Sequence, residues 1–189
     1  MLEPCPGCGA LFAQLVENLN HPYIGASADC WALFAALVAG QTPDADLIAA
    51  SRIGAARAEA PAVPDLSVLP GVESLLVDAY AAQHHGESSP QAIQSVAVHL
   101  LTLRGVLECN VDPAQALWVR RRALRTRGVF HRLTPPPLGA ALSIRHLFPG
   151  GGVDRPCSTA DYVVSVYTAW STCHAATLAD WYTRFVLAD

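Results

Sequence analysis

The chain has 189 residues, of which 52% are hydrophobic and 15% charged, and its formal net charge is −4 at pH 7. All 12 cationic residues are arginine, which excludes a Schiff-base lysine, a P-loop lysine or a lysine general base. The composition argues against disorder and against the basic surface of a general nucleic-acid-binding protein.

The N-terminal residues contain neither the basic nor the apolar stretch of a secretory signal. The longest apolar run, residues 30–39, is shorter than the roughly 20 residues that cross a bilayer. We therefore expect a cytoplasmic protein without a membrane anchor, in which the six cysteines need not form disulfides.

Residues 5–9 read Cys-Pro-Gly-Cys-Gly, and this is the most informative motif of the chain. A Pro/Gly turn directs the sulfurs of Cys5 and Cys8 at one point, which is half of a tetrahedral zinc site. A redox dithiol has the same spacing, but it lies where a helix begins after a strand, and nothing around residues 5–8 has that pattern. The motif thus predicts Zn²⁺ as a cofactor.

Helical periodicity dominates the chain, and no convincing alternating strand is found. We expect a short helix over residues 10–19, a loop to residue 27, and a helix from residue 28 to about 39 with Ser27 as its N-cap. A weaker helix follows residues 42–44, with Thr42 as a candidate cap and Pro43 in its first turn. Three prolines mark residues 60–70 as a linker.

Stronger helices follow this linker. The pattern predicts helices over residues 71–84, from Ser89 to about 108, from Asp112 to 127 and from 158 to 187. Residues 140–147 are expected to form a short strand or a helical turn. We predict a mainly α fold, an irregular helical bundle with an N-terminal zinc knuckle. Residues 1–189 would form a single domain, with residues 1–31 as the knuckle segment packed on it.

The zinc site needs two further ligands. Cys30 is the nearest remaining thiol and lies just inside a predicted helix N-terminus, where the helix dipole favours a thiolate. The fourth ligand is expected to be a histidine. His84 and His85 lie together at the end of a predicted helix, and His21 lies between the knuckle and Cys30. The residues alone do not decide which of these three histidines is the fourth ligand.

Asp78, His99 and His174 lie on three different apolar helices and are candidates for a catalytic or second metal site. Inward-facing carboxylate and imidazole groups in a bundle can build such a site. The alternative is that both histidines are core residues whose ring nitrogens are hydrogen-bonded.

One predicted helix carries a cluster of arginines at 120, 121, 122, 125 and 127. Such a cluster can bind phosphate or carboxylate groups. A solvated helix face whose charges compensate the helix dipole is the simpler interpretation, and nucleic acid is not an expected partner.

Several segments, taken in order, resemble an uncharacterised bacterial, mostly actinobacterial, family of unknown function. They are the Cys-Pro-Gly-Cys-Gly knuckle, Cys-Trp at 30–31, Val-Asp-x-Tyr-x-x-Gln-His at 77–84 and Ser-Val-x-x-His-Leu at 95–100. The resemblance implies a metal-dependent helical fold and no particular activity. The chain departs from the family pattern at His85, where proline is usual, and at residues 73–76, where the family often has a histidine.

From the residues and the resemblance together, we expect Zn²⁺ to bind Cys5, Cys8, Cys30 and His84 and to stabilise the fold. The protein would then bind a small molecule, or act as an accessory protein, and it could form a homo-oligomer. The competing hypothesis is a metal-dependent hydrolase or group transferase that uses the zinc or the Asp78, His99 and His174 set.

Overall fold

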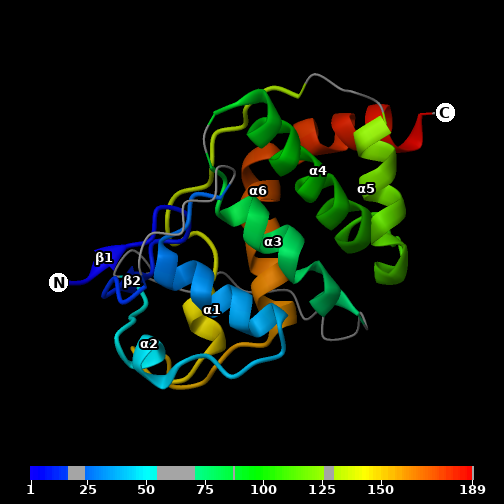
Figure 1. Ribbon diagram of the computed structural model, residues 1–189. Coiled ribbons are helices and arrows are strands. Elements are labelled where there is room, and N and C mark those ends of the chain that lie inside the picture. Colours follow the sequence, from blue (N-terminus) through cyan, green and yellow to red (C-terminus); the bar gives the residue numbers. More distant parts are fainter. Residues whose placement is uncertain (17–23, 55–70, 87, 126–129, 189) are drawn as a thin grey trace.

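The computed structural model describes residues 1–16, 24–54, 71–86, 88–125 and 130–188, which are mostly helical (Figure 1). Its N-terminal part contains a two-stranded antiparallel sheet, in which Glu3 pairs with Phe12. The elements of this part are β1 (Glu3–Pro4), β2 (Leu11–Phe12), α1 (Ala28–Val38) and α2 (Ala45–Ala49).

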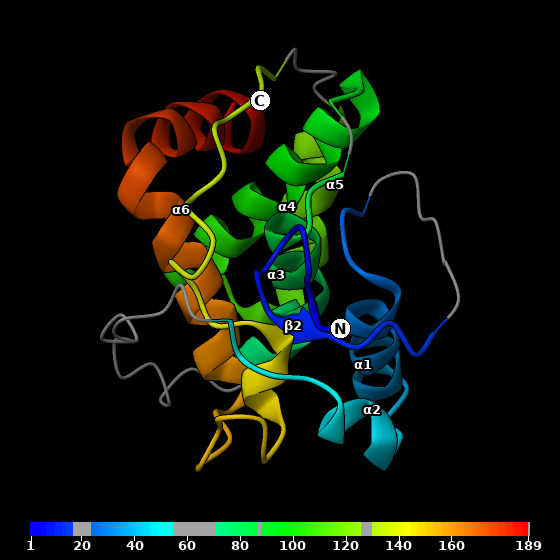
Figure 2. The same ribbon diagram turned by 90° about the vertical axis from the view of Figure 1, so that its left-hand side faces the viewer.

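The helical body follows. Its α-helices are α3 (Leu76–Gln83), α4 (Pro90–Leu107), α5 (Ala116–Arg125) and α6 (Thr159–Tyr182). Short 3-10 turns are η1 (Val72–Leu75), η2 (Pro113–Gln115) and η3 (Ile144–Leu147), and the π-helical η4 (Thr183–Leu187) follows α6. Helix α4 packs against α3, α5 and α6 and is therefore the central helix of this body. Figure 2 shows α3 between α6 and α1.

Local capping explains where the main helices begin. The Ser27 hydroxyl accepts a hydrogen bond from the Cys30 backbone N–H at the start of α1, and Ser89 caps α4 in the same way. Ser158 and Asp161 form a capping box at the start of α6. These three predicted helix starts are confirmed.

The predicted helix over residues 10–19 is wrong within the described residues. Leu11 and Phe12 form β2, and Leu11 also exchanges two backbone hydrogen bonds with Arg52. Ala10 and Phe12 are buried whereas Leu11 is only half-buried, so burial here has the two-residue period of a strand. Residues 17–19 lie outside the described residues, as do His21 and the predicted linker over 60–70.

Two other helix boundaries differ from the predicted ones. The cap of α2 is Asp44, whose carboxylate accepts from the Asp46 N–H, rather than Thr42. The predicted C-terminal helix departs from helical geometry at His174, where φ is −136°, and it ends as the π-helical η4. Residues 140–147 were expected to form a short strand or a helical turn, and residues 144–147 form a 3-10 helical turn. Within the described part of the chain, no helix has the length and apolar run that a membrane span needs.

Candidate metal centre

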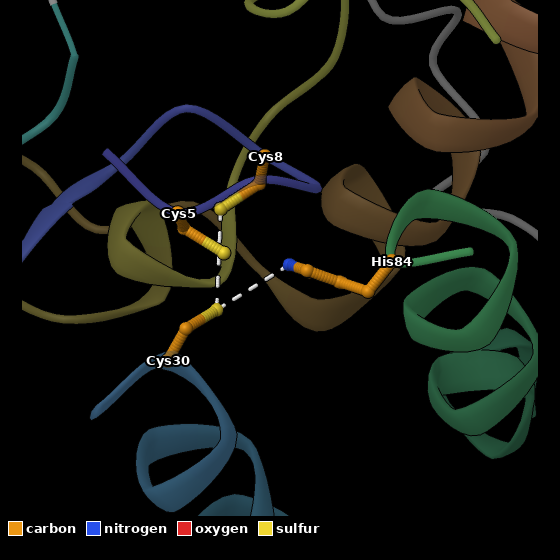
Figure 3. A group of neighbouring side chains, drawn as sticks. All are labelled: Cys5, Cys8, Cys30 and His84. Carbon is orange, nitrogen blue, oxygen red and sulfur yellow. Dashed lines mark hydrogen bonds between the residues drawn. The ribbon is translucent and has the colours of Figure 1, made fainter. Parts of the chain in front are cut away.

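Four side chains from three separate segments meet between the N-terminal strands and the helical body (Figure 3). Cys5 and Cys8 lie in the turn between β1 and β2, Cys30 lies in the first turn of α1, and His84 is the C-cap of α3. All four are buried, and their ligand atoms lie within 4.8 Å of one another. Among the described residues, this is the one group of three or more Cys, His, Asp or Glu residues close enough to hold a metal ion.

The turn that carries the first two cysteines is closed by its own backbone. The Cys5 N–H donates to the Ala10 carbonyl at 2.7 Å, and the Gly9 N–H donates to the Cys5 carbonyl at 2.9 Å. Gly9 has a φ of +72°, a left-handed conformation that favours glycine. The Ser27 N–H donates to the Cys5 sulfur at 3.4 Å, so the start of α1 also contacts the knuckle.

The sulfur atoms are thiols rather than a disulfide. The Sγ atoms of Cys8 and Cys30 are 3.9 Å apart, about twice the length of an S–S bond. The Nε2 atom of His84 lies 3.3 Å from the Cys30 sulfur. These separations leave room for an ion at the centre of the group.

The imidazole of His84 is held in one orientation. Its Nδ1 atom is 3.0 Å from the carbonyl oxygen of Tyr80, one turn earlier in α3. A carbonyl only accepts, so Nδ1 carries the proton and the unprotonated Nε2 faces the sulfurs. A histidine ligand that donates its other N–H to a backbone carbonyl is the usual arrangement around protein-bound metals.

The charge state of the cysteines depends on what the site holds. Hydrogen bonds from Cys30 and Cys8 lower the pKa of Cys5 far below its usual range. Burial, together with the neighbouring sulfurs, raises the pKa of Cys30 well above its usual value. The pKa of Cys8 is raised as well, so without a cation the cluster favours one thiolate beside two neutral thiols. A divalent ion would reverse this preference, because it stabilises each thiolate directly.

Tyr80 contacts two of the four cluster residues. Its hydroxyl donates to the Cys30 sulfur at 3.4 Å, and its ring stacks on those of His84 and Phe34 with centroids 3.9 and 3.8 Å away. The stack joins α3 to α1 beside Cys30 and His84.

Replacing Tyr80 with phenylalanine keeps the stacked ring and removes the hydrogen bond to Cys30. We expect metal affinity to fall about tenfold, the usual lower range when a group that supports a ligand is lost. Competition with a coloured chelator measures this change. Tyr162→Phe is the matched control, because the Tyr162 hydroxyl is also buried but donates to the Gln83 amide oxygen. Equal affinities for the two variants would contradict the supporting role of Tyr80.

Gly7 lies in close contact with His84. A Cβ atom at position 7 would stand 2.8 Å from the His84 Cα and 2.5 Å from its ring Cδ2, so the ring or the backbone would have to move. We expect Gly7→Ala to weaken metal binding and to lower the free energy of unfolding by about 1–3 kcal/mol. Gly40→Ala is the control, since its φ of +65° carries a backbone cost but nothing lies within 4 Å. If both variants retain metal equally in a chelator competition, the close contact does not matter for the site.

Of the other two histidines considered as ligands, His85 lies outside the cluster and His21 lies outside the described residues. The His85 ring makes an edge contact with Trp170, with centroids 6.2 Å apart. Burial lowers the pKa of His85. The Nδ1 atom of His85 is buried and has no hydrogen-bond partner in the described part of the chain.

The structure brings together two of the three predicted catalytic candidates. The buried Asp78 carboxylate lies 2.7 Å from Nδ1 of His99, and Nη2 of Arg120 donates to both of its oxygens at 2.7 Å. His174 is elsewhere, and its Nε2 lies 2.7 Å from the Thr134 carbonyl. The three residues therefore do not form one site.

The sequence interpretation missed Arg120 as the partner of Asp78. Its position could have been found from periodicity, because Ala116, Val119 and Ala123 mark the buried side of α5 and Arg120 shares that side. Arg121 and Arg125 are exposed, as expected for a solvated face.

A comparison with known families matched residues 65–171, more than half of the chain, to a family of unknown function, DUF5946. The chain belongs to DUF5946. Searches of curated proteins and of solved structures found no match. The DUF5946 match includes His84, Asp78 and His99, whereas the three cysteines of the cluster lie before it.

Proposed function

We propose that this DUF5946 protein binds one Zn²⁺ through Cys5, Cys8, Cys30 and His84, and that the ion is structural. The protein would then be a zinc-stabilised binding or accessory protein. The observation that carries the proposal is the set of four buried ligand atoms, three sulfurs and one nitrogen, within 4.8 Å of one another.

The distances support a tetrahedral zinc ion. With Zn–S bonds of about 2.3 Å and a Zn–N bond of about 2.0 Å, two sulfurs lie about 3.8 Å apart and a sulfur and a nitrogen about 3.5 Å. The Cys8–Cys30 separation is 3.9 Å and the Cys30–His84 separation is 3.3 Å. Soft thiolates with one imidazole favour zinc over the oxygen-seeking calcium and magnesium ions.

Two observations favour a structural over a catalytic ion. Four protein ligands complete a tetrahedron and leave no position for a water molecule, whereas catalytic zinc sites keep one open. The other candidate groups are already hydrogen-bonded apart from the cluster, His99 to Asp78 and His174 to the Thr134 carbonyl. We therefore do not propose a hydrolase or a transferase.

The role of the ion would be to join distant segments. Cys8 and Cys30 are 22 residues apart, and Cys30 and His84 are 54 residues apart. Closing long loops is costly in chain entropy, and a bound ion that requires the closed form contributes its binding free energy to folding.

Metal content and thiol reactivity test the proposal. We expect one zinc per chain, and three additional reactive thiols after chelation. Cys5→Ser should lose the zinc. Cys173→Ser should retain it, because Cys173 is exposed and lies outside the cluster. Metal-free native protein with all six thiols reactive would refute the zinc site.

A further inference from the structure

Helix α5 leaves a mixed apolar and basic face uncovered, at the edge of the molecule opposite β1 and β2 (Figure 1). Its residues Leu117, Trp118 and Leu124 have exposed fractions of 50%, 47% and 50%. Arg121 and Arg125 are exposed on the same helix, and within the described residues neither makes a hydrogen bond or an ion pair. We call these five residues the α5 face. Large apolar residues gathered in this way, unlike single ones, are typical of interaction sites.

On the α5 face the basic residues lie between the apolar ones. With about 3.6 residues per turn, Leu117 and Leu124 lie along one side of the face and Trp118 along the other. Arg121 and Arg125 lie one turn apart in the middle. A helix that lies on a lipid surface instead has its apolar residues together on one side and its cations on the other. The central arginines therefore favour a protein partner over a membrane.

Trp118 is exposed but held in place. The Cζ atom of Arg122 lies 5.9 Å from the centre of the Trp118 ring. Arg122 is itself fixed, because its Nε donates to the Val186 carbonyl at 3.0 Å and its Nη2 to the Ala188 carbonyl at 2.8 Å. An aromatic side chain that is already ordered loses little conformational entropy when a partner covers it. Tryptophan and arginine are also enriched among the residues that dominate binding energy at protein interfaces.

The charge of this helix differs from that of the rest of the chain. Five of the 12 arginines lie within residues 120–127, a range without Asp or Glu. The remaining residues contain all 16 acidic residues and the other seven arginines, so their formal charge is −9. A symmetric dimer through the α5 face would set arginines against arginines, and like charges across an interface are costly. Carboxylates, by contrast, bind arginine through two parallel hydrogen bonds.

We propose that the α5 face binds an acidic, partly apolar segment of another protein. Two carboxylates of this segment would bind Arg121 and Arg125, and its apolar side chains would cover Leu117, Leu124 and Trp118. The α5 face contains none of the four candidate metal ligands, so this inference goes beyond the zinc site and does not depend on it.

A designed helical peptide tests the chemistry of the partner. The probe has two glutamates one turn apart, with leucines on one side and a phenylalanine on the other. Its matched form has glutamines in place of the two glutamates. In fluorescence anisotropy titrations of the intact protein, we expect the glutamate peptide to bind at least about tenfold more tightly, because hydrogen bonds between charged groups are the stronger ones. Absence of binding, or equal binding of the two peptides, would overturn the proposal.

Charge reversal tests the place of binding. Arg121→Glu combined with Arg125→Glu should abolish binding of the glutamate peptide and create binding of a peptide with lysines at the same two positions. Arg155→Glu is the control, because Arg155 is exposed and lies outside α5. A double variant that still preferred the glutamate peptide would overturn the assignment to the α5 face.

A measurement on the unmodified protein does not depend on how the variants fold. The indole N–H resonance of Trp118 should shift when the glutamate peptide binds, whereas that of Trp170, which is 3% exposed, should not. Peptide binding without a shift at Trp118 would place the partner elsewhere and overturn the proposal.

Vesicles and zinc content on the same samples separate the remaining explanations. Protein that bound vesicles of equal parts phosphatidylcholine and phosphatidylglycerol through Trp118, but not the glutamate peptide, would show a lipid surface in place of the acidic segment. Zinc-loaded protein that failed to bind the peptide would refute the role of the α5 face alone. Metal-free protein in which the peptide shifts Trp118 would refute the zinc site alone.

Discussion

Removing the metal is expected to detach the N-terminal segment from the helical body. Structural zinc sites bind their ion with about 10–16 kcal/mol, which is comparable to the total stability of a typical domain, about 5–15 kcal/mol. The sheet that carries Cys5 and Cys8 has only two residues in each strand, and an isolated hairpin is marginally stable at best. Without the ion, the knuckle would keep only the burial of Ala10 and Phe12 and a few backbone hydrogen bonds to hold it against the helical body.

Hydrogen exchange measures this detachment residue by residue. The informative amides are those of Cys5, Leu11 and Gly25, which donate to the carbonyls of residues 10, 52 and 84. They should lose protection after chelation, while amides in the middle of α4 keep it. Protein carrying Cys109→Ser should behave like the unmodified chain before and after chelation, because Cys109 is exposed and outside the cluster. Equal protection of the three amides with and without metal would show that the ion does not hold the segment.

Helix starts were predictable because capping is local. At Ser27, Ser89 and Ser158 the hydroxyl accepts from a backbone N–H three residues later. Such an interaction depends on a few neighbouring residues and therefore leaves a clear sequence pattern. The same positions define where α1, α4 and α6 begin in the structure.

The region after the knuckle was not predictable for the opposite reason. Its conformation depends on partners that are distant in sequence, since Leu11 pairs with Arg52 and the Asp29 carboxylate accepts from the N–H groups of Leu15 and Val16. A short apolar run fits a helix and a strand almost equally well when such partners are unknown.

The metal cluster shows the same division between local and distant information. The spacing of Cys5 and Cys8 was enough to predict that both are metal ligands. The choice between His84 and His85 as a further ligand needs three-dimensional geometry. Nδ1 of His84 bonds to the Tyr80 carbonyl and so directs Nε2 to the sulfurs, whereas His85 lies against Trp170. Adjacent residues at a helix end point in different directions, which spacing alone does not resolve.

Asp78→Asn is expected to destabilise the helical body without removing the metal. The Asp78 side chain is 1% exposed and joins three helices, through Arg120 of α5 and His99 of α4. Removing one partner of a buried ion pair typically costs 3–5 kcal/mol, because the remaining charge loses its compensation. The Arg120 side chain is 33% exposed and can be partly solvated, so we expect about 3 kcal/mol, or a fall in Tm of roughly 6–12 °C.

Asp180→Asn is the matched control, because Asp180 pairs with Arg184 at a side-chain exposure of 57% and 63%. Exposed pairs one helical turn apart contribute about 0.3–0.5 kcal/mol, so this variant should melt within about 2 °C of the unmodified protein. Both variants should retain one zinc per chain, since neither residue is one of the four candidate ligands. Loss of zinc in Asp78→Asn would mean that the carboxylate acts on the site through α3. If Asp78→Asn melted at the same temperature as the control, solvent would be compensating the charges of Arg120 and His99 in place of the Asp78 carboxylate.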